Sequence, residues 1–252
     1  MFKHNYNVIG VMSGTSLDGV DLAHINFEIK NGKWFYKIFE CDTISYSNEM
    51  ISKLKNGIHF SSIELSELNI EYTNLLGNII SEFIAKKNIS NLDAVCSHGH
   101  TILHQPQNGF TLQIGNLREI AKITNQKVVC DFRVQDVLLG GQGAPLVPIG
   151  DKILFSEFDY CLNLGGIANV SYRHEGKRLA LDVSPFNLVI NHLVSKVGWV
   201  MDKDGEEASK GKVNEDLLQQ LHAVPFYTIK ALVNACAISS LSLCSSSDRY
   251  TY

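Results

Sequence analysis

The sequence has no excess of basic residues: 22 Lys and Arg stand against 26 Asp and Glu, for a formal net charge of −4. That balance argues against a nucleic-acid partner. No run of about 18 apolar residues occurs, so we expect no membrane-spanning segment and no membrane partner. The first ten residues, MFKHNYNVIG, contain no apolar signal-peptide core, and we therefore expect a cytoplasmic protein.

Paired cysteines are also absent. The chain has six cysteines, and none stands in a C-x-x-C pair. Cys96, Cys130 and Cys161 lie inside apolar segments that are typical of strands. We expect buried, reduced thiols, and neither a disulfide framework nor a cysteine-based zinc site.

What is present is a regular alternation of strand and helix patterns. Three strands are predicted in succession and are followed by a long amphipathic helix at 62–88. We expect a histidine-rich loop directly after residue 97. The predicted strands lie at 7–13, 20–29, 33–42, 92–97, 110–114 and 127–131, with a short helix at 116–124. Three strands in a meander, then alternating helix and strand, are the order of a ribonuclease-H-like α/β half.

The segment 158–183 repeats the beginning of that order. It reads as a strand, a glycine-rich bend, a second strand, a short turn and a third strand. Helical patterns follow at 186–196 and 214–222. We therefore expect two copies of one half, with the glycine-rich hairpins of both halves facing each other around a phosphate chain.

This organisation divides the chain into a first half at 1–150, a partial second half at 151–231 and an atypical tail at 232–252. The second half is incomplete, because the strands and helices that end the first half have no counterpart in it. The tail contains six serines and two cysteines but no Gly or Pro. We interpret it as a truncation or a frameshift, and the alternative is a natural, divergent C-terminus.

The stretch VIGVMSGTSLDGVDLA, at 8–23, supports two interpretations. Gly, Ser and Asp are common turn formers, so it could be an ordinary hairpin turn. Alternatively, its backbone N–H groups surround a phosphate and a nearby carboxylate holds a metal. The second glycine-rich hairpin, LGGIAN at 164–169, favours the anion-binding loop.

Four motifs together resemble the anhydro-N-acetylmuramic acid kinase family: GVMSGTSLDGVDLA, SHGHTILHQP, DFRVQDVLLGGQGAPLVP and LNLGGIANV. The resemblance implies an α/β protein with the duplicated ribonuclease-H-like (actin-like ATPase) fold, its second half incomplete. It implies ATP and Mg²⁺, hydrolytic opening of 1,6-anhydro-N-acetylmuramic acid, and phosphorylation of O6 in peptidoglycan recycling. The implied partners are ATP and the amino sugar, and a homodimer is left open.

The catalytic base is expected among the acids of DFRVQDVLLGGQGAP. Water that attacks an anomeric carbon needs a carboxylate base. The segment offers Asp131 and Asp136, and the resemblance assigns the base to Asp136. Asp131 ends an apolar strand and is interpreted as a structural residue, capping or pairing with Arg133.

The resemblance also implies the binding residues. Those for the sugar are His98, Arg133, Gly141 and Gln142. Those for the ATP phosphates are Ser13, Gly14, Thr15, Ser16, Leu17, Asp18, Gly19, Gly165, Gly166 and Asn169. Mg²⁺ is expected at Asp18 and Asp182. The segment DVSPFN at 182–187 lacks the glycine of the family pattern D-T-G-P-x-N, which argues against close phosphate approach there.

Two alternative functions remain open at this point. The H-x-H-x₃-H spacing of His98, His100 and His104 suits a zinc site, as in a metallohydrolase. The resemblance gives these histidines no metal role, so sugar contact or loop bracing is favoured. The family's glycine-rich adenosine-binding motif is absent, which allows an inactive remnant that binds sugar or nucleotide without turnover.

Overall fold

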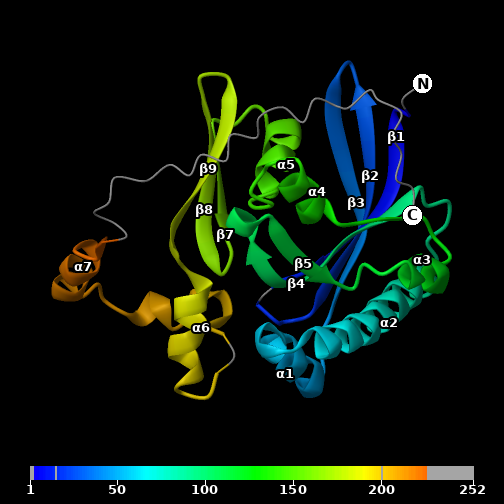
Figure 1. Ribbon diagram of the computed structural model, residues 1–252. Helices are drawn as coiled ribbons and strands as arrows, with labels where there is room; N and C mark the ends of the chain where they lie inside the picture. Colours follow the sequence, from blue (N-terminus) through cyan, green and yellow to red (C-terminus); the bar gives the residue numbers. More distant parts are fainter. Residues whose placement is uncertain (1–2, 15, 200, 226–252) are drawn as a thin grey trace. The chain divides into compact units, whose positions relative to one another are not determined.

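The structure is a computed structural model that describes residues 3–14, 16–199 and 201–225. It contains two compact units, one ending at Leu146 and the other beginning at Val147 (Figure 1). Among the described residues, no helix combines the length and apolar character that a membrane crossing needs. The mixed helix and sheet content agrees with the predicted α/β class.

Unit 1 is built on a mixed sheet with the strand order β3-β2-β1-β4-β5, and β6 also pairs with β4. The strands are β1 (Asn5–Ser13), β2 (Val20–Lys30), β3 (Lys33–Ile44), β4 (Ala94–Gln105), β5 (Phe110–Ile114) and β6 (Val128–Val129). The helices are α1 (Asn48–Asn56), α2 (Ser62–Lys86), α3 (Glu119–Thr124) and α4 (Phe132–Leu138). β1 and β6 run parallel to β4, and the other pairs are antiparallel.

Helix α2 covers one face of this sheet (Figure 1). Ser61 and Glu64 form a capping box that satisfies backbone N–H groups at the start of the helix. Alternate residues of β1, including Ile9 and Val11, point from the sheet toward α2 and are buried. Burial of this apolar surface is the main force that holds helix and sheet together.

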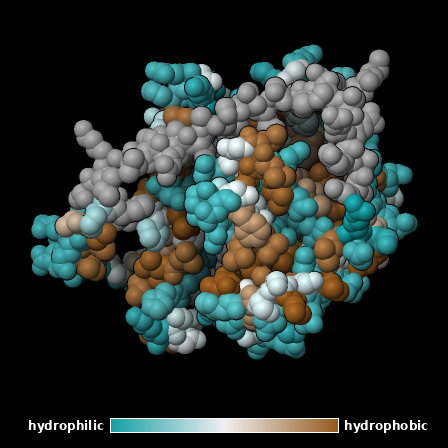
Figure 2. All heavy atoms as spheres, in the orientation of Figure 1, coloured by the Kyte–Doolittle hydropathy of each residue, from teal (hydrophilic) through white to brown (hydrophobic). Residues whose placement is uncertain are grey.

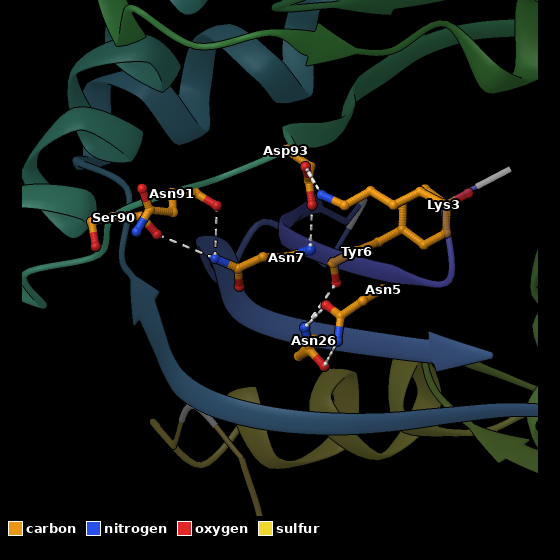
Figure 3. Close-up of polar contacts among 8 residues, drawn as sticks. All are labelled: Lys3, Asn5, Tyr6, Asn7, Asn26, Ser90, Asn91 and Asp93. Atoms are coloured by element: carbon orange, nitrogen blue, oxygen red, sulfur yellow. Dashed lines mark hydrogen bonds and ion pairs between the residues drawn. The ribbon is translucent and has the colours of Figure 1, made fainter. Parts of the chain in front are cut away.

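The parallel register of β1 and β4 is fixed at the end of the sheet where β1 begins (Figure 3). Asn7 donates its backbone N–H to Oδ2 of Asp93 at 2.8 Å, and Lys3 pairs with the same carboxylate. The Asn7 side chain donates to the carbonyl oxygens of Ser90 and Asn91, at 3.2 and 3.1 Å. These bonds tie β1 to the segment before β4, and the resulting register brings Ser13 opposite His100.

Unit 2 contains a smaller antiparallel sheet with the order β7-β8-β9. Its strands are β7 (Tyr160–Leu164), β8 (Ile167–His174) and β9 (Lys177–Pro185), and its helices are α5 (Val147–Leu154), α6 (Asn187–Ser195) and α7 (Glu215–His222). Arg178 is buried and donates to Oγ of Ser171, the carbonyl oxygen of Phe158 and Sγ of Cys161. This arginine therefore links β9 to β8, β7 and the segment before β7.

Many apolar side chains of unit 2 are exposed. Tyr160, Leu162 and Leu164 alternate along β7, so they share one face of the sheet, and they are 71%, 60% and 52% exposed. Helices α6 and α7 contain no buried residue. Figure 2 shows apolar side chains at the surface in the region of α6.

Most predicted strands are present at nearly the predicted bounds, and α2, α6 and α7 are present as well. The prediction of a histidine-rich loop after residue 97 is wrong, because β4 continues through the histidines to Gln105. Short turns of 3₁₀-helix lie at Gly57–His59, Pro106–Asn108, Lys203–Gly205 and Ala208–Lys210.

The four described cysteines are free, and Cys96, Cys130 and Cys161 are half-buried; Cys236 and Cys244 lie outside the described residues.

Candidate active site

The carboxyl ends of the three parallel strands β1, β4 and β6 meet at one edge of the unit 1 sheet. Open α/β sheets bind ligands at this edge. A groove of about 650 Å³ lies there, on the sheet face opposite α2. It is lined mainly by β1–β4, including His98 of β4, and by Phe132. The predicted sugar residues of unit 1 adjoin this groove through His98 and the start of α4.

Asp136 stands on α4, and the backbone that follows the helix folds over its carboxylate. The N–H of Gly143 donates to Oδ2 of Asp136 at 2.7 Å. A Cβ atom on Gly141 would lie 2.6 Å from Oδ1 of the same carboxylate, so only glycine leaves room for it. The glycine-rich turn therefore fixes one oxygen of Asp136 and leaves Oδ1 without a hydrogen-bond partner among the described residues. Gln142 lies exposed between the two glycines.

Arg133 and His98 form a directional pair beside Asp136. The guanidinium Nε donates to Nε2 of His98 at 2.7 Å, and Nη1 donates to the carbonyl oxygen of Gly143 at 2.6 Å. Nε2 of His98 must therefore be unprotonated, and its Nδ1–H donates to the carbonyl oxygen of Gly99 at 2.8 Å. Burial, together with the charge of Arg133, lowers the pKa of His98. No carboxylate within the described residues forms an ion pair with Arg133.

The two histidines of H-x-H point to opposite faces of the sheet. In a regular strand residues 98 and 100 would share a face. Gly99 has φ +68°, and the β1–β4 pairing shifts at this point, so an extra residue bulges from β4. His98 consequently faces Arg133 and the groove, whereas His100 faces the core. Within the described ranges no group of three His, Cys, Asp or Glu could hold a metal ion, so the zinc interpretation is wrong for these residues.

On the core side, His100 joins a ring of three buried hydroxyls. Ser13 lies 2.6 Å from the Tyr46 hydroxyl and 2.8 Å from Nδ1 of His100. Tyr72 donates to Ser13 at 2.8 Å, and the two tyrosine hydroxyls are 2.6 Å apart. Each of these four hydrogen bonds needs one proton, and the three hydroxyls supply only three. The fourth proton must therefore be donated by Nδ1 of His100. Burial lowers the pKa of His100 to about 4 and raises that of both tyrosines, so the ring is uncharged at neutral pH.

The segment between β1 and β2 is the predicted phosphate loop, and it is anchored at both ends. Ser13 begins it, and the ring uses its hydroxyl, which leaves only backbone groups and the later residues for a ligand. Gly19 ends it at φ +151°, where a Cβ atom would lie 2.9 Å from the carbonyl carbon of Ile44. Leu17 adopts φ 61° and packs against the core. Asp18 is exposed and accepts from the Ser16 hydroxyl at 2.7 Å; Thr15 lies outside the described residues.

The remaining predicted residues belong to unit 2. Gly165 and Gly166 form the bend between β7 and β8, and their carbonyl oxygens accept N–H groups from residues 186–188 at the start of α6. Asn169 pairs with Asp182 across β8 and β9, and Asp182 is exposed. These four residues therefore lie along one glycine-rich hairpin and the strand beside it.

Asn116 is a residue of this site that sequence reasoning missed. It follows β5 and donates from Nδ2 to Oδ1 of Asp131 at 2.9 Å. Asp131 was expected to cap a helix or pair with Arg133, and it does neither: it occupies the N-cap position of α4 without a side-chain capping bond. The signal that could have indicated Asn116 is its place directly after an apolar strand, in the segment LQIGN.

Comparisons with known proteins agree on one family. The family model described as anhydro-N-acetylmuramic acid kinase matches residues 6–233. The protein of that name from Shewanella putrefaciens is 37% identical over 242 residues, which are 89% of this chain and 63% of the relative. The Clostridioides difficile protein of the same name is 38% identical over 233 residues, 84% of this chain and 60% of the relative. The chain thus spans less than two thirds of the length of these curated relatives.

Similarity to solved structures is weak. A Ppx/GppA family member from Aquifex aeolicus has a TM-score of 0.33 and 9% sequence identity, over 75% of this chain and 54% of that chain.

Proposed function

Because the chain belongs to the anhydro-N-acetylmuramic acid kinase family, we propose that it phosphorylates O6 of 1,6-anhydro-N-acetylmuramic acid while opening the anhydro ring with water. The family match supports the reaction class, and the carboxylate of Asp136 in its glycine-rich turn supports the hydrolytic part. The product is N-acetylmuramic acid 6-phosphate, an intermediate of peptidoglycan recycling. ATP as co-substrate fits a cytoplasmic location.

The proposed fold is a duplicated ribonuclease-H-like fold of the actin-like ATPase type. Each unit contains a three-stranded antiparallel meander, β1–β3 in unit 1 and β7–β9 in unit 2. Helix α1 follows the first meander and α6 the second. The domains we propose are the first half at 1–150, the partial second half at 151–231 and the tail at 232–252.

In the proposed reaction Asp136 acts as general base. Water forms a bond to C1 while the bond from C1 to O6 breaks, and Asp136 accepts the proton that the water loses. O6 forms a bond to the γ-phosphorus of ATP, and the bond between that phosphorus and the β–γ bridging oxygen breaks. ADP, the phosphorylated sugar and the proton from Asp136 are released.

Arg133 supplies the positive charge for the substrate's carboxylate. Its Nε and Nη1 are oriented by His98 and Gly143, and Nη2 has no hydrogen-bond partner among the described residues. A guanidinium held in this way presents N–H groups in a fixed plane that matches a carboxylate. Gly141 and Gln142 contribute the backbone and side chain that line the sugar on the Asp136 side.

The proposed phosphate-binding residues are 13–19 in unit 1, through backbone N–H groups and the exposed Ser16 hydroxyl, and Gly165, Gly166 and Asn169 in the hairpin of unit 2. Asp18 fits a magnesium site, since Mg²⁺ uses one or two carboxylates together with phosphate oxygens and water. Asp182 is the second exposed carboxylate that we propose for Mg²⁺. When bound, Mg²⁺ supplies charge that offsets the negative charge of the phosphates.

The experiment that tests this function is a turnover assay on the purified 252-residue chain with the anhydro sugar and Mg·ATP. We expect ADP and N-acetylmuramic acid 6-phosphate in equal amounts from the wild type. Asp136→Asn should lower turnover by about 10²- to 10⁴-fold, because the amide cannot accept a proton. Sugar affinity should change little, since the shape of the side chain is kept.

Asp159→Asn, at an exposed aspartate of unit 2, is the matched control and should have wild-type turnover. Wild-type turnover by Asp136→Asn would show that Asp136 is not the base. Sugar binding without turnover by the wild type would favour a non-catalytic binding protein.

A further inference from the structure

Asn116 contacts the bulge of β4 and the start of α4, the two elements that carry the candidate active site. Its Nδ2 donates to Oδ1 of Asp131 at 2.9 Å and lies 3.5 Å from the carbonyl oxygen of His98. Its Oδ1 lies 3.5 Å from the hydroxyl of Ser97. A Cβ atom on Gly99 would come within 2.9 Å of Nδ2, so the Asn116 amide lies directly against the bulge of β4.

Asp131 starts helix α4 in an unusual backbone conformation. Its φ and ψ are 60° and 31°, the left-handed region that is unfavourable for residues with a side chain, although Asp tolerates it better than most. Its short hydrogen bond is the one from Asn116, and among the described residues its one other side-chain hydrogen bond, from Sγ of Cys130, is 4.0 Å long. The Asn116 bond therefore offsets part of the backbone cost and fixes where α4 begins.

The start of α4 decides where the reacting groups lie. Arg133 and Asp136 follow Asp131 by two and five residues on the same short helix. His98, which accepts from Arg133, belongs to the β4 segment that Asn116 also contacts. A displacement of α4 relative to β4 would separate Arg133 from His98 and move the carboxylate of Asp136 with it.

We propose that Asn116 and Asp131 are positioning residues for this site: their side-chain bond holds α4 on the bulge of β4 and so sets the place of Arg133 and Asp136. The inference rests on the proposed function, because it assigns the bond a role in that reaction. A misplacement of about 1 Å at a reacting group can cost about 10²-fold in rate.

Exchange of the two side chains tests the proposal. Asn116→Asp places two carboxylates side by side, and we expect turnover at pH 8 to fall by about 10²-fold. That loss should shrink toward pH 6, because two adjacent carboxylates readily share a proton. In Asp131→Asn the two amide side chains can still form a hydrogen bond, so turnover should fall by only about threefold.

The double variant Asn116→Asp/Asp131→Asn restores one donor and one acceptor with the direction reversed. Its turnover should recover to within about fivefold of that of the wild type, since the bond is re-formed. Asn125→Asp makes the same chemical change at an exposed position after α3 and is the matched control, with wild-type turnover expected. Anhydro-sugar binding and thermal unfolding are measured for every variant.

Wild-type turnover of Asn116→Asp with an unchanged pH profile would overturn the proposal. So would a folded double variant that remains as slow as Asn116→Asp. If Asn116→Asp does not fold, Asn116→Ser replaces it: the serine is too short to reach Asp131 and adds no charge, and unchanged turnover in that variant would also overturn the proposal. Failure of the proposed function would be recognised separately, because the wild type itself would then lack turnover.

Discussion

Gly141 lies directly against the carboxylate of Asp136: a Cβ atom on this glycine would be 2.6 Å from Oδ1 and closer still to Oδ2. The carboxylate cannot turn away without losing the bond from the N–H of Gly143. The backbone of the glycine-rich turn and the side chain of Asp136 therefore fit together as one unit.

Gly141→Ala should consequently displace the Asp136 carboxylate. We expect turnover to fall by about 10²-fold, since the proposed base loses its geometry. Gly150→Ala is the control: this glycine lies in α5 with open space around its Cβ position, and alanine there should stabilise unit 2 by about 0.5–1 kcal/mol. Steady-state kinetics and thermal unfolding of both variants check this, and equal turnover would contradict it.

Gly19→Ala should weaken nucleotide binding more than Gly14→Ala. Gly19 has φ +151°, and its Cβ would lie 2.9 Å from the carbonyl carbon of Ile44, so the end of the loop must move. Gly14 has no left-handed φ, and its nearest neighbour is the flexible Ser16 hydroxyl at 3.1 Å. Calorimetric titration with Mg·ATP measures the difference, and equal affinities would show that the loop does not contact phosphate.

Tyr72→Phe should destabilise unit 1. The substitution removes the hydroxyl that donates to Ser13 and contacts Tyr46, and it leaves a gap in a buried polar ring. We expect the free energy of unfolding to fall by about 1–3 kcal/mol. Thr73→Val, at the buried neighbour whose hydroxyl makes only a 3.4 Å contact with Asn69, should cost less. Urea unfolding of both variants measures this. An equal decrease in the free energy of unfolding for both would contradict a specific stabilising role of the hydroxyl ring.

Stability should fall as the pH drops below 6.5. Burial lowers the pKa of His100 from 6.5 to about 4, so between these values the unfolded chain binds a proton that the folded chain does not. The stability is fully present above pH 6.5 and is lost progressively toward pH 4, by up to about 3 kcal/mol for this group at about 1.4 kcal/mol per pKa unit. The pKa values of His98 and His24 are also lowered by burial and add in the same direction.

Urea unfolding between pH 4.5 and 8 measures this dependence. His100→Gln should flatten the profile, and His59→Gln, at an exposed histidine, is the control for the loss of a histidine. A His100→Gln profile as steep as that of the wild type would assign the effect to other groups.

Limited proteolysis should leave a fragment of unit 1. The main apolar core lies entirely within residues 9–128, whereas α6 and α7 of unit 2 bury no residue. We expect a resistant fragment containing residues 8 to about 146 and early cleavage in unit 2. Mass spectrometry of the fragments identifies the cuts, and equal resistance of both units would contradict the expectation. From the sequence we also expect early cuts after residue 230, a region that lies outside the described residues.

Elements with a strong local pattern were predictable from the sequence. Alternation identified β1, β2 and β3, and the helical period of apolar residues identified α2. Helix α4 was not predicted, because it spans only 132–138 and its N-cap side chain bonds elsewhere. The continuation of β4 was missed because the bulge at Gly99 breaks the alternation on which strand prediction depends.

The residues of the candidate site also fall into those that sequence motifs indicated and those that only the tertiary structure brings together. Asp136, Arg133 and His98 were singled out from motifs, and the structure brings them together on α4 and β4. Asn116 could not be found from motifs, because its partner Asp131 is fifteen residues away and the bond exists only when β5 and α4 lie side by side. Contacts of this kind depend on tertiary packing, which leaves no periodic signature in the sequence.

The bulge at Gly99 gives β4 a mechanical property. His98 and His100 are joined by two peptide bonds, yet one belongs to the groove and the other to the hydroxyl ring that anchors the loop after β1. Because both side chains are attached to one three-residue segment of backbone, a shift of this segment would displace both the contact with Arg133 and the contact with Ser13. The groove and the loop after β1 are therefore positioned by one segment of β4.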